Sequence, residues 1–456
     1  MSERFDAIVI GGGQAGPPLA GRLTAAGMTV ALVERHLLGG TCVNTGCMPT
    51  KTLVASAYAA HLARRADLGV EAGEVRIDFA RVKGRADAIS RNARAGIEAF
   101  LGGMKGLSLL RGHARLEGPD RVRVGDALLS APRIFVNVGG RALLPDLPGV
   151  GDVPSLDNST LLALERLPDH LLVVGGSYVG LEFAQIYRRL GARVTVVERN
   201  PRLIMREDEE ISECVRTILE AEGIAVRTKA ECIRLMPHPD GVGIGLDCED
   251  GPPEIFGSHL LLAVGRRPNT DDLGLEAAGV AADARGYIQV DDRLASNVPG
   301  IWALGECNGR GAFTHTAYND FEIVAANLLD GEDRKVTDRV PGYALYVDPP
   351  LGRAGLTEAE ARASGRPILV SRRPMSRVGR AIEKGETQGL MKVVADADTK
   401  RILGAAILGP GGDEAIHGIL DMINADQPWP VLERAVPIHP TISELIPTLL
   451  ADLAPA

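Results

Sequence analysis

The 456-residue chain has few aromatic residues, few cysteines and no long apolar run. Phe, Trp and Tyr together make up 4% of it, and six cysteines are too few for a disulfide-stabilised scaffold of this length. No apolar stretch approaches the roughly 20 residues of a membrane-spanning helix, so we expect no membrane segment. The net charge of −9 argues against nucleic acid as a partner, because its phosphates require a basic surface.

The start of the chain also lacks the features of a targeting segment. Residues 1–6 carry no basic cluster, and neither a long apolar core nor a small-residue cleavage site follows them. We therefore expect the protein to be cytoplasmic. The chain is long enough for about three domains, and its 54 glycines suit a fold with many tight turns and close approaches of backbone to ligands.

Two segments of the sequence predict the same strand–turn–helix–strand unit. The first has a strand at 6–10, a Gly-rich turn, a helix to about Ala26 and a strand at 29–33. The second follows about 165 residues later, which indicates an internal repeat. Its elements are a strand at 171–174, a helix at 181–190 that Gly191 ends, and a strand at 193–197.

The turn of the first unit has the spacing of a dinucleotide-binding fingerprint, Gly11-x-Gly13-x-x-Gly16. The first Gly permits the tight turn, the second lets the backbone approach a pyrophosphate, and the third lets the helix pack on the strand. The helix N-terminus favours an anion. Glu34, at the end of the second strand, can accept hydrogen bonds from a ribose diol. Strand, helix and acid together predict a nucleotide site here.

The second unit carries a variant of this fingerprint, Gly175-x-Ser177-x-x-Gly180, followed by Glu198. Two such sites suggest two dinucleotides, one tightly held and one exchanging. Glu198 favours NADH slightly, because a carboxylate repels a 2′-phosphate. Arg199 and Arg202 follow it closely and could instead receive that phosphate, so NADPH stays open.

The remaining landmarks organise the rest of the chain. Short apolar runs at 133–139, 260–265 and 301–305 end in Gly or Gly-Glu and are typical of strands buried in a parallel sheet. From about residue 341 the pattern changes to an antiparallel hairpin formed by 389–394 and 402–408. A helical face follows, made of Ala415, Ile416, Ile419, Leu420 and Ile423.

Two of the six cysteines lie close together, five residues apart in Gly39-Gly-Thr-Cys42-Val-Asn-Thr-Gly-Cys47-Met-Pro-Thr-Lys51. In a reducing compartment such a pair is more often catalytic or metal-binding than structural. A zinc site would need two further ligands at fitting spacing, and the neighbouring sequence supplies none; we predict no metal site. A dithiol beside a flavin can store the two electrons of a hydride. We expect the other four, Cys214, Cys232, Cys248 and Cys307, to be small buried side chains.

The cysteine segment resembles the signature of the flavoprotein disulfide reductases, the class I pyridine nucleotide-disulfide oxidoreductases. Three later motifs resemble this family in the same order, so the resemblance covers essentially the whole chain. These motifs are Gly265-Arg-Arg-Pro-Asn269, Ile301-Trp-Ala-Leu-Gly-Glu306 and His439-Pro-Thr-Ile-Ser-Glu444.

This resemblance implies an α/β fold with two Rossmann-like domains, one for FAD and one for NAD(P), and a C-terminal α+β dimerisation domain. We expect the FAD domain at 1–150 and 271–340, the NAD(P) domain at 151–270 and the interface domain at 341–456. It also implies a homodimer whose active sites are shared between the subunits.

The resemblance also implies roles for single residues. Cys42 would be the thiol that attacks the substrate, and Cys47 the thiolate against the flavin, able to form a charge-transfer complex with it. Lys51 would lie near the flavin and pair with Glu182, while Tyr178 would gate the nicotinamide pocket or, alternatively, be a core aromatic. His439 and Glu444 would form the general acid–base pair. The remaining cofactor residues would be Gly11, Gly13, Gly16, Glu34, Thr41, Lys51, Gly305 and Glu306 for FAD, and Gly175, Tyr178, Gly180, Glu198, Arg199 and Gly265 for NAD(P).

The chain departs from the family pattern at two places near the flavin. Glu306 stands where the family usually has Asp, bonded to the ribityl chain, and the longer side chain could shift the local backbone. Asn137 stands in a segment where Thr-Gly is usual. Neither change removes the chemistry.

The electron acceptor is the least determined part of this interpretation. The sequence has no cysteine after Cys307, whereas mercuric reductases carry a C-terminal cysteine pair, and His439 stands where they generally lack histidine. The segments 309–315 and 372–377 and Arg380 look most like a bacterial branch of mercuric-reductase-like and reactive-chlorine-resistance flavoproteins, some of which reduce copper or hypothiocyanous acid. We therefore expect a small thiol-reactive, disulfide or metal-ion acceptor.

Alternatives to this acceptor class stay open. Dihydrolipoamide dehydrogenase and glutathione reductase are possible within the family. From other classes, an FAD oxidase or monooxygenase without a cysteine relay, or a non-enzymatic scaffold, would not need all six of Cys42, Cys47, Lys51, Glu182, His439 and Glu444.

Overall fold

The computed structural model describes residues 2–247 and 253–456, and these form two compact units. Unit 1 consists of Met1–Thr52, Lys83–Leu143 and Gly265–Arg339, and unit 2 of Leu53–Val82, Leu144–Val264 and Val340–Ala456. Two long helices, α3 (Cys47–Arg64) and α4 (Phe79–Gly102), begin in one unit and end in the other. Among the residues described, no helix is both long and apolar enough to span a membrane.

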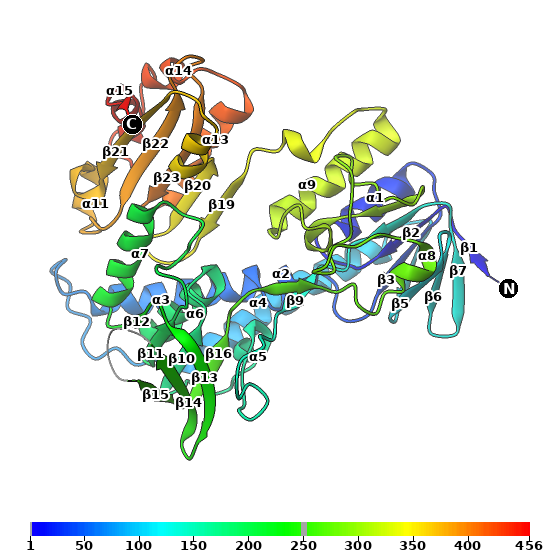
Figure 1. Ribbon diagram of the computed structural model, residues 1–456, viewed down its shortest axis with the longest axis horizontal. Helices are drawn as coiled ribbons and strands as arrows, with labels where there is room; N and C mark the ends of the chain where they lie inside the picture. Colours follow the sequence, from blue (N-terminus) through cyan, green and yellow to red (C-terminus); the bar gives the residue numbers. More distant parts are fainter. Residues whose placement is uncertain (1, 248–252) are drawn as a thin grey trace. The chain divides into compact units, whose positions relative to one another are not determined.

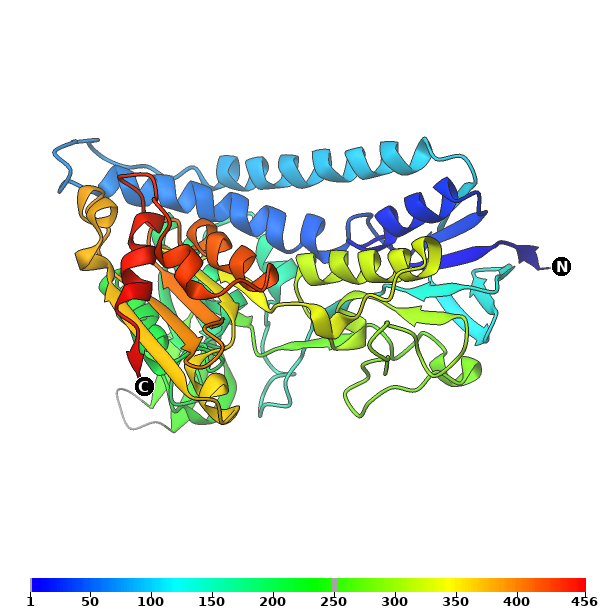
Figure 2. The same ribbon diagram turned by 90° about the horizontal axis from the view of Figure 1, so that it is seen from above.

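Unit 1 is built on a five-stranded parallel sheet with the order β18-β8-β2-β3-β4. Its strands are β2 (Ala7–Ile10), β3 (Val30–Glu34), β4 (Leu107–Arg111), β8 (Ile134–Val136) and β18 (Ile301–Ala303). The central strand β2 is buried along its whole length, as a short apolar run in a parallel sheet should be. Helices α1 (Gly16–Ala25) and α9 (Thr314–Ala325) lie side by side against this sheet (Figure 1, Figure 2).

Smaller elements complete unit 1. An antiparallel sheet of three strands and one parallel edge strand has the order β1-β7-β6-β5, and β9 pairs antiparallel with β17. Helix α2 (Gly40–Asn44) carries the first cysteine. The other bounds are β1 (Glu3–Arg4), β5 (Ala114–Gly118), β6 (Arg121–Val124), β7 (Ala127–Ser130), β9 (Gly140–Ala142), β17 (Arg266–Pro268), α8 (Leu275–Ala278), η1 (Gly305–Asn308), η2 (Ala326–Asp330) and η3 (Val336–Asp338).

Unit 2 contains the second parallel sheet, with the order β12-β11-β10-β16. Helix α6 (Tyr178–Leu190) joins β10 to β11, and Gly191 ends it with φ +120°, as predicted. The antiparallel sheet β13-β14-β15 packs on the parallel one through a shared apolar core. The bounds are α5 (Asn158–Leu162), β10 (His170–Val174), β11 (Arg193–Val197), α7 (Glu209–Ala221), β12 (Ala225–Arg227), β13 (Glu231–His238), β14 (Gly241–Asp247), β15 (Glu254–Gly257) and β16 (His259–Leu262).

The C-terminal part of unit 2 is a six-stranded antiparallel sheet with the order β19-β20-β23-β22-β21-β24 (Figure 1). The predicted hairpin is confirmed, since β22 (Leu390–Asp396) and β23 (Ile402–Leu408) pair antiparallel. The bounds of the other elements are β19 (Gly342–Leu345), β20 (Leu351–Gly355), α10 (Glu358–Ala363), β21 (Ile368–Pro374), η4 (Met375–Arg377), α11 (Gly379–Glu383), α12 (Gly412–Ala415), α13 (His417–Asn424), α14 (Trp429–Glu433), η5 (Ser443–Leu445), α15 (Ile446–Ala451) and β24 (Ala454–Pro455).

The predicted helical face at 415–423 is divided between two short helices. α12 ends at Ala415 and α13 begins at His417, with the right-handed helical residue Ile416 between them. The face survives this division, because Ala415, Ile416 and Ile419 lie in one apolar core. The fold class is confirmed: two Rossmann-like halves and a C-terminal α+β part. The division into three domains with the stated bounds stays a prediction.

Candidate functional site

The first fingerprint loop joins β2 to α1, and contacts within unit 1 determine two of its three glycines. Gly11 has φ +106°, and a Cβ there would lie 2.2 Å from the carbonyl oxygen of Asn137. A Cβ on Gly16 would lie 2.2 Å from the carbonyl oxygen of Gly11. Gly13 differs, since its nearest neighbour would be Asn137 Nδ2 at 3.4 Å. The middle glycine therefore keeps space open rather than serving internal packing.

The acid at the end of β3 is buried and held by backbone donors. Glu34 is 8% exposed, and its two carboxylate oxygens each accept a hydrogen bond of 2.7 Å, from the N–H groups of Gly12 and His36. This fixes the carboxylate beside the loop, where the sequence predicts a ribose contact.

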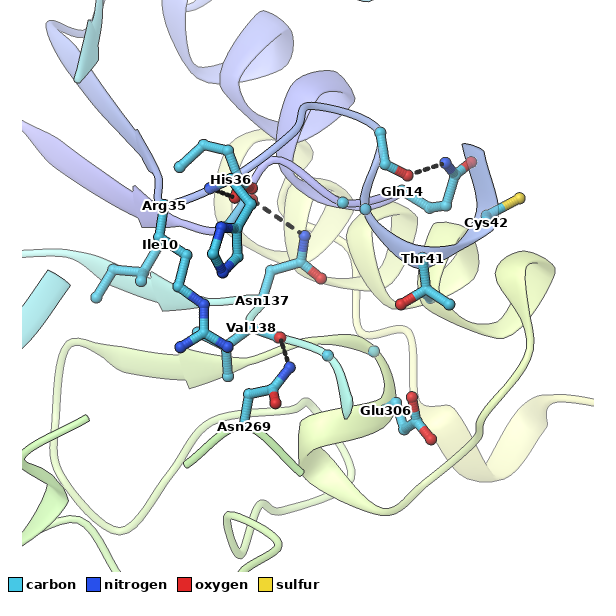
Figure 3. A pocket seen from close by; sticks show the side chains of 18 of the residues that line it. Ile10, Gln14, Arg35, His36, Thr41, Cys42, Asn137, Val138, Asn269 and Glu306 are labelled. Atoms are coloured by element: carbon cyan, nitrogen blue, oxygen red, sulfur yellow. Dashed lines mark hydrogen bonds between the residues drawn. The ribbon is translucent and has the colours of Figure 1, made fainter. Parts of the chain in front are cut away.

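One cavity of about 390 Å³ follows this loop. In Figure 3, Arg35 and His36 lie at one end of it and Thr41 and Cys42 at the other, with Asn137 between them. Its wall contains Gly11, Gly13, Glu34, Thr41, Cys42, Gly305 and Glu306, all predicted for this site, and also Gln14, Asn137, Asn269 and Thr314. An elongated cavity with a buried acid at one end, an open glycine and a helix N-terminus fits FAD.

The cysteine segment is attached to the fingerprint loop. Gly39 N–H donates to the carbonyl oxygen of Gly12 at 2.7 Å, and Gln14 Nε2 donates to the carbonyl oxygen of Gly39 at 3.1 Å (Figure 3). Gly40 packs so closely that a Cβ there would lie 3.0 Å from the Cα of Gly13. The glycines before Cys42 therefore bring helix α2 against the nucleotide loop.

The two thiols lie at the ends of neighbouring short segments. Cys42 is half-buried in α2, and Cys47 is exposed at the N-terminus of α3, where the helix dipole favours a thiolate. Both are free thiols. The pKa of Cys42 is raised, first by its hydrogen bond to Cys47 and then by burial, while a hydrogen bond with Thr314 and the charge of Lys51 act to lower it.

Thr314 is a site residue that the sequence analysis missed. Its Oγ1 lies 3.3 Å from Cys47 Sγ, and it begins helix α9, far from the cysteines in sequence. The motif at Gly309–His315 singled out its neighbourhood, but no spacing rule relates it to the thiols. Of the other cysteines, Cys307 fits the expectation of a small buried side chain and Cys214 fits it only in part. Cys307 is buried, which raises the pKa of its thiol to about 12, and Cys214 is half-buried. Cys248 and the side chain of Cys232 lie outside the described residues.

The turn that carries Glu306 is held by a buried acid. Asp320, 2% exposed, accepts hydrogen bonds of 2.8 Å from Gly305 N–H and from Asn308 Nδ2, and it pairs with Arg339. The Glu306 carboxylate itself is paired with Arg266. Asn137, the other departure from the family pattern, donates from Nδ2 to the carbonyl oxygen of Gly11 at 3.2 Å.

The second fingerprint loop, in unit 2, repeats these contacts. A Cβ on Gly175 would lie 2.3 Å from the carbonyl oxygen of Ala263, and one on Gly180 would lie 2.1 Å from that of Gly175. Glu198 is 8% exposed and accepts hydrogen bonds from Gly176 N–H at 2.7 Å and Asn200 N–H at 2.8 Å. Asn200 Nδ2 adds a third at 2.6 Å.

The two arginines beyond Glu198 have different surroundings. Arg202 donates to the carbonyl oxygens of Met205 and Glu207, at 3.4 and 3.2 Å. Arg199 instead lines a second cavity, together with Asn200 and Arg234. Of the two, only Arg199 lines a cavity that the described residues form. Gly265, also predicted for the NAD(P) site, begins the last segment of unit 1, where its carbonyl oxygen accepts from Leu143 N–H.

Tyr178, the predicted gate, packs against a second tyrosine. The ring of Tyr343 meets it edge-on, with centroids 5.5 Å apart. Burial raises the pKa of Tyr178 far above its usual range. Tyr343 donates its hydroxyl to Glu207 at 2.7 Å, and Glu207 forms a fully buried ion pair with Arg353. The sequence analysis missed this group, although a single Arg in the apolar strand β20 signals a buried partner.

Glu182, on the same helix as Tyr178, lies on a face that binds the segment before β20. Its Oε1 accepts from Tyr346 N–H at 3.0 Å. One turn on, Gln185 exchanges two hydrogen bonds with the backbone of Asp348, at 2.7 and 2.9 Å. Lys51 belongs to unit 1, so its predicted pairing with Glu182 stays a prediction.

His439 and Glu444 form a hydrogen-bonded pair near the end of the chain. His439 Nδ1 lies 2.8 Å from Glu444 Oε2, and the imidazole is 79% exposed whereas the carboxylate is 13% exposed. The carboxylate can thus orient an imidazole whose other nitrogen faces outward. In the described part of the chain, no cluster of three or more His, Cys, Asp or Glu could hold a metal ion.

Fold and site together define an oxidoreductase with two dinucleotide-binding halves and a cysteine pair at the first of them. The chain matches the family described as pyridine nucleotide-disulphide oxidoreductase over residues 5–320 and its dimerisation domain over 341–450. It therefore belongs to the pyridine nucleotide-disulphide oxidoreductase family, which is FAD-dependent and uses a pyridine nucleotide.

Three relatives show the breadth of this likeness. The probable pyridine nucleotide-disulfide oxidoreductase RclA of Escherichia coli is 34% identical over 98% of this chain and 99% of its own. A dihydrolipoyl dehydrogenase of Thermus scotoductus is 36% identical (97% and 96%), and a mercuric reductase of Streptomyces lividans 33% (97% and 94%). The solved Cu(II) complex of the HOCl-induced flavoprotein disulfide reductase RclA from Escherichia coli superposes with a TM-score of 0.89, 33% identity and coverage of 98% and 99%.

Proposed function

We propose that the protein passes two electrons from NAD(P)H through FAD and the Cys42–Cys47 pair to a small acceptor that reacts with thiols. One observation carries this proposal: Cys42 lies in the wall of the same cavity as the first fingerprint loop and Glu34. A nucleotide bound along that cavity would reach from the acid to the thiol. FAD supplies the step that converts a two-electron hydride donor into a reductant of a disulfide.

The cysteine pair would store and deliver the electrons. Two electrons and two protons break the Cys42–Cys47 bond and leave two thiols. With a disulfide acceptor, the Cys42 thiolate attacks one sulfur and releases the other as a thiolate. Cys47 then attacks Cys42 Sγ, which reforms the internal disulfide and releases the second thiolate. The hydrogen bond between the two thiols keeps the second nucleophile beside the first.

His439 and Glu444 would supply the acid–base step. The imidazole can take the proton of Cys42 and return it to the leaving thiolate, while the carboxylate 2.8 Å away holds its orientation. The family match over 341–450 is to a dimerisation domain. We therefore propose a homodimer in which this pair serves the cysteines of the other subunit.

The acceptor class follows from the branch that the chain resembles. A cupric ion is one candidate, because the related RclA was solved as a Cu(II) complex. Without a three-ligand cluster among the described residues, copper would be a substrate that meets the thiols rather than a resident ion. Two cupric ions would each take one electron and become cuprous while the Cys42–Cys47 disulfide reforms and the two thiol protons pass to solvent.

A second candidate function is dihydrolipoyl dehydrogenase. The observation in its favour is the buried Glu198 carboxylate, which suits NADH, together with 36% identity to an enzyme of that name. We propose NADH as the preferred donor, because the carboxylate beside the second loop would repel a 2′-phosphate. Arg199 is the residue whose cavity position would favour NADPH instead.

The test is anaerobic oxidation of NADH and NADPH with a panel of acceptors. The panel holds lipoamide, glutathione disulfide, mercuric ion, cupric ion and hypothiocyanous acid. We expect turnover with at least one of them, lost in Cys42→Ser but kept in the control Cys214→Ser. Turnover that survives Cys42→Ser would mean direct reduction by the flavin, as in an oxidase, and the relay would be wrong.

A further inference from the structure

The carboxylate of Glu306 forms a two-pronged ion pair in the wall of the first cavity. Arg266 donates from Nε to Oε1 at 2.6 Å and from Nη2 to Oε2 at 2.9 Å. Arg266 Nη2 also donates to the carbonyl oxygen of Gly140 at 2.7 Å. Neither side chain is widely exposed, at 24% for Arg266 and 13% for Glu306. Such paired, charge-assisted hydrogen bonds fix both the position and the charge of a carboxylate.

The surrounding chain makes room for the longer acid. Gly140 faces Glu306, and a Cβ on Gly140 would lie 2.8 Å from both Cδ and Oε2 of Glu306. The strand pairing of β9 with β17 sets Pro268 opposite Gly140 and Arg266 opposite Ala142, which places the guanidinium over the same space. Asp320 holds the backbone of the same turn through the N–H of Gly305 at 2.8 Å, and the side chain of Glu306 reaches Arg266 from there.

Charge explains why this pairing matters to the cavity. FAD carries two phosphate charges, and a lone carboxylate in a half-buried wall would add repulsion that the local dielectric screens weakly. Removing one partner of a buried pair also leaves the other charge unsatisfied. Arg266 therefore does two things for Glu306: it balances the charge and it fixes which way the oxygen lone pairs point.

We propose that Arg266 is a positioning residue for the flavin nucleotide, which holds and charge-balances Glu306 in the space that Gly140 leaves open. This inference rests on the proposed function, since it takes FAD as the ligand of the cavity.

The test is a double-mutant comparison of FAD binding to apoprotein, measured by quenching of flavin fluorescence. Arg266→Ala should raise the dissociation constant of FAD at least tenfold. In a Glu306→Gln background, Arg266→Ala should raise the dissociation constant of FAD less than threefold, because the carboxylate charge that Arg266 balances is absent. The control is Arg267→Ala, since Arg267 pairs with Asp271 at 2.7 Å instead and should leave FAD binding unchanged.

The midpoint potential of the bound flavin gives a second readout. An unbalanced carboxylate disfavours the more negative reduced flavin, so Arg266→Ala should shift the potential downward and Glu306→Gln in the same chain should restore it. If Arg266→Ala yields no folded apoprotein, Arg266→Gln in the same two backgrounds makes the same comparison.

Two results would overturn the inference. Equal losses of affinity in both backgrounds would mean that Arg266 acts on the nucleotide directly rather than through Glu306. No loss in either would mean that the pair is irrelevant to FAD. Failure of the proposed function looks different, because wild-type apoprotein would then bind no FAD at all, or the holoprotein would reduce acceptors without Cys42.

Discussion

The two fingerprint loops have nearly the same internal geometry but different surroundings. Glu34 and Glu198 each accept a 2.7 Å hydrogen bond from the second residue of their loop. A Cβ on Gly12 would lie 2.5 Å from Leu38, and one on Gly176 would lie 2.6 Å from Leu203. Contacts within the protein thus require the first and third glycines and fix the acid. We expect the residue at the middle position, Gly13 or Ser177, to be determined by the ligand instead.

The repeat extends further than the strand–turn–helix unit. After Glu34 the chain crosses back over its own loop, where Gly39 N–H donates to the carbonyl oxygen of Gly12 at 2.7 Å. After Glu198 it does the same, with Ile204 N–H donating to that of Gly176 at 2.8 Å. Three residues beyond each of these bonds stand Cys42 and Glu207. The same crossing segment therefore carries a thiol in unit 1 and a buried structural acid in unit 2.

Removing the partner of that acid should have the largest effect on stability. Arg353 and Glu207 are 1% and 0% exposed at their side chains, so Arg353→Ala leaves a buried carboxylate unpaired. We expect it to lower the free energy of unfolding of unit 2 by about 3–5 kcal/mol. Urea denaturation and hydrogen exchange of the β20 amides measure this. The control Arg76→Ala removes a pair with Glu74 that is exposed on both sides and should cost less than about 1 kcal/mol; a similar loss in both variants would contradict the prediction.

A smaller effect is expected for the tyrosine that binds the same acid. Tyr343→Phe removes a 2.7 Å hydrogen bond to a charged acceptor but keeps the ring that packs on Tyr178. The free energy of unfolding of unit 2 should fall by about 1.5–3 kcal/mol. The same denaturation experiment applies, and a variant as stable as the wild type would show that Glu207 relies on Arg353 alone. Tyr343→Ala should cost more, because it also removes the edge-on contact.

A substitution at the middle position of the first loop tests whether that glycine serves FAD binding or the stability of the protein. Gly13→Ala places a Cβ at least 3.4 Å from other protein atoms, so apoprotein stability should not change. The same Cβ projects into the cavity wall and should weaken FAD binding at least about tenfold, or ~1.4 kcal/mol. FAD titration of the apoprotein measures it. Gly84→Ala, with open space around its Cβ, is the matched control. Unchanged FAD affinity would mean that the nucleotide does not approach this glycine.

The sequence predicted the parts of this comparison that depend on local pattern. The strand at 193–197 has the predicted bounds, and the predicted helix at 181–190 begins three residues earlier, because Tyr178 and Gly180 belong to the motif and also to the first turn. Seven predicted residues do gather in one cavity wall. Gly11, Gly13 and Glu34 followed from the spacing of one strand–turn–helix motif, whereas Thr41, Gly305 and Glu306 followed from the family resemblance.

Long-range partners were not predictable in this way. Thr314 is 267 residues from Cys47, and Arg353 is 146 residues from Glu207. Glu306 was recognised as unusual, but its partner Arg266 lies 40 residues away on strand β17, and only the contact in the folded chain identifies it. Such contacts depend on how strands are ordered in a sheet, which no local period encodes.

The smallest expected effect concerns the thiol in the crossing segment of unit 1, and whether Thr314 influences the reactivity of Cys42. The hydrogen bond with Thr314 acts to lower the pKa of Cys42, so Thr314→Val should raise that pKa further above its usual value. At a fixed pH less thiolate is then present, so alkylation of the reduced enzyme by iodoacetamide should slow, by roughly threefold. The rate profile should move to higher pH, whereas Thr314→Ser keeps a hydroxyl and should leave it in place. Identical profiles for Thr314→Val and wild type would mean that the reactivity of Cys42 depends on Cys47 and not on Thr314. The crossing segment of unit 1 would then differ from that of unit 2 only in carrying a cysteine.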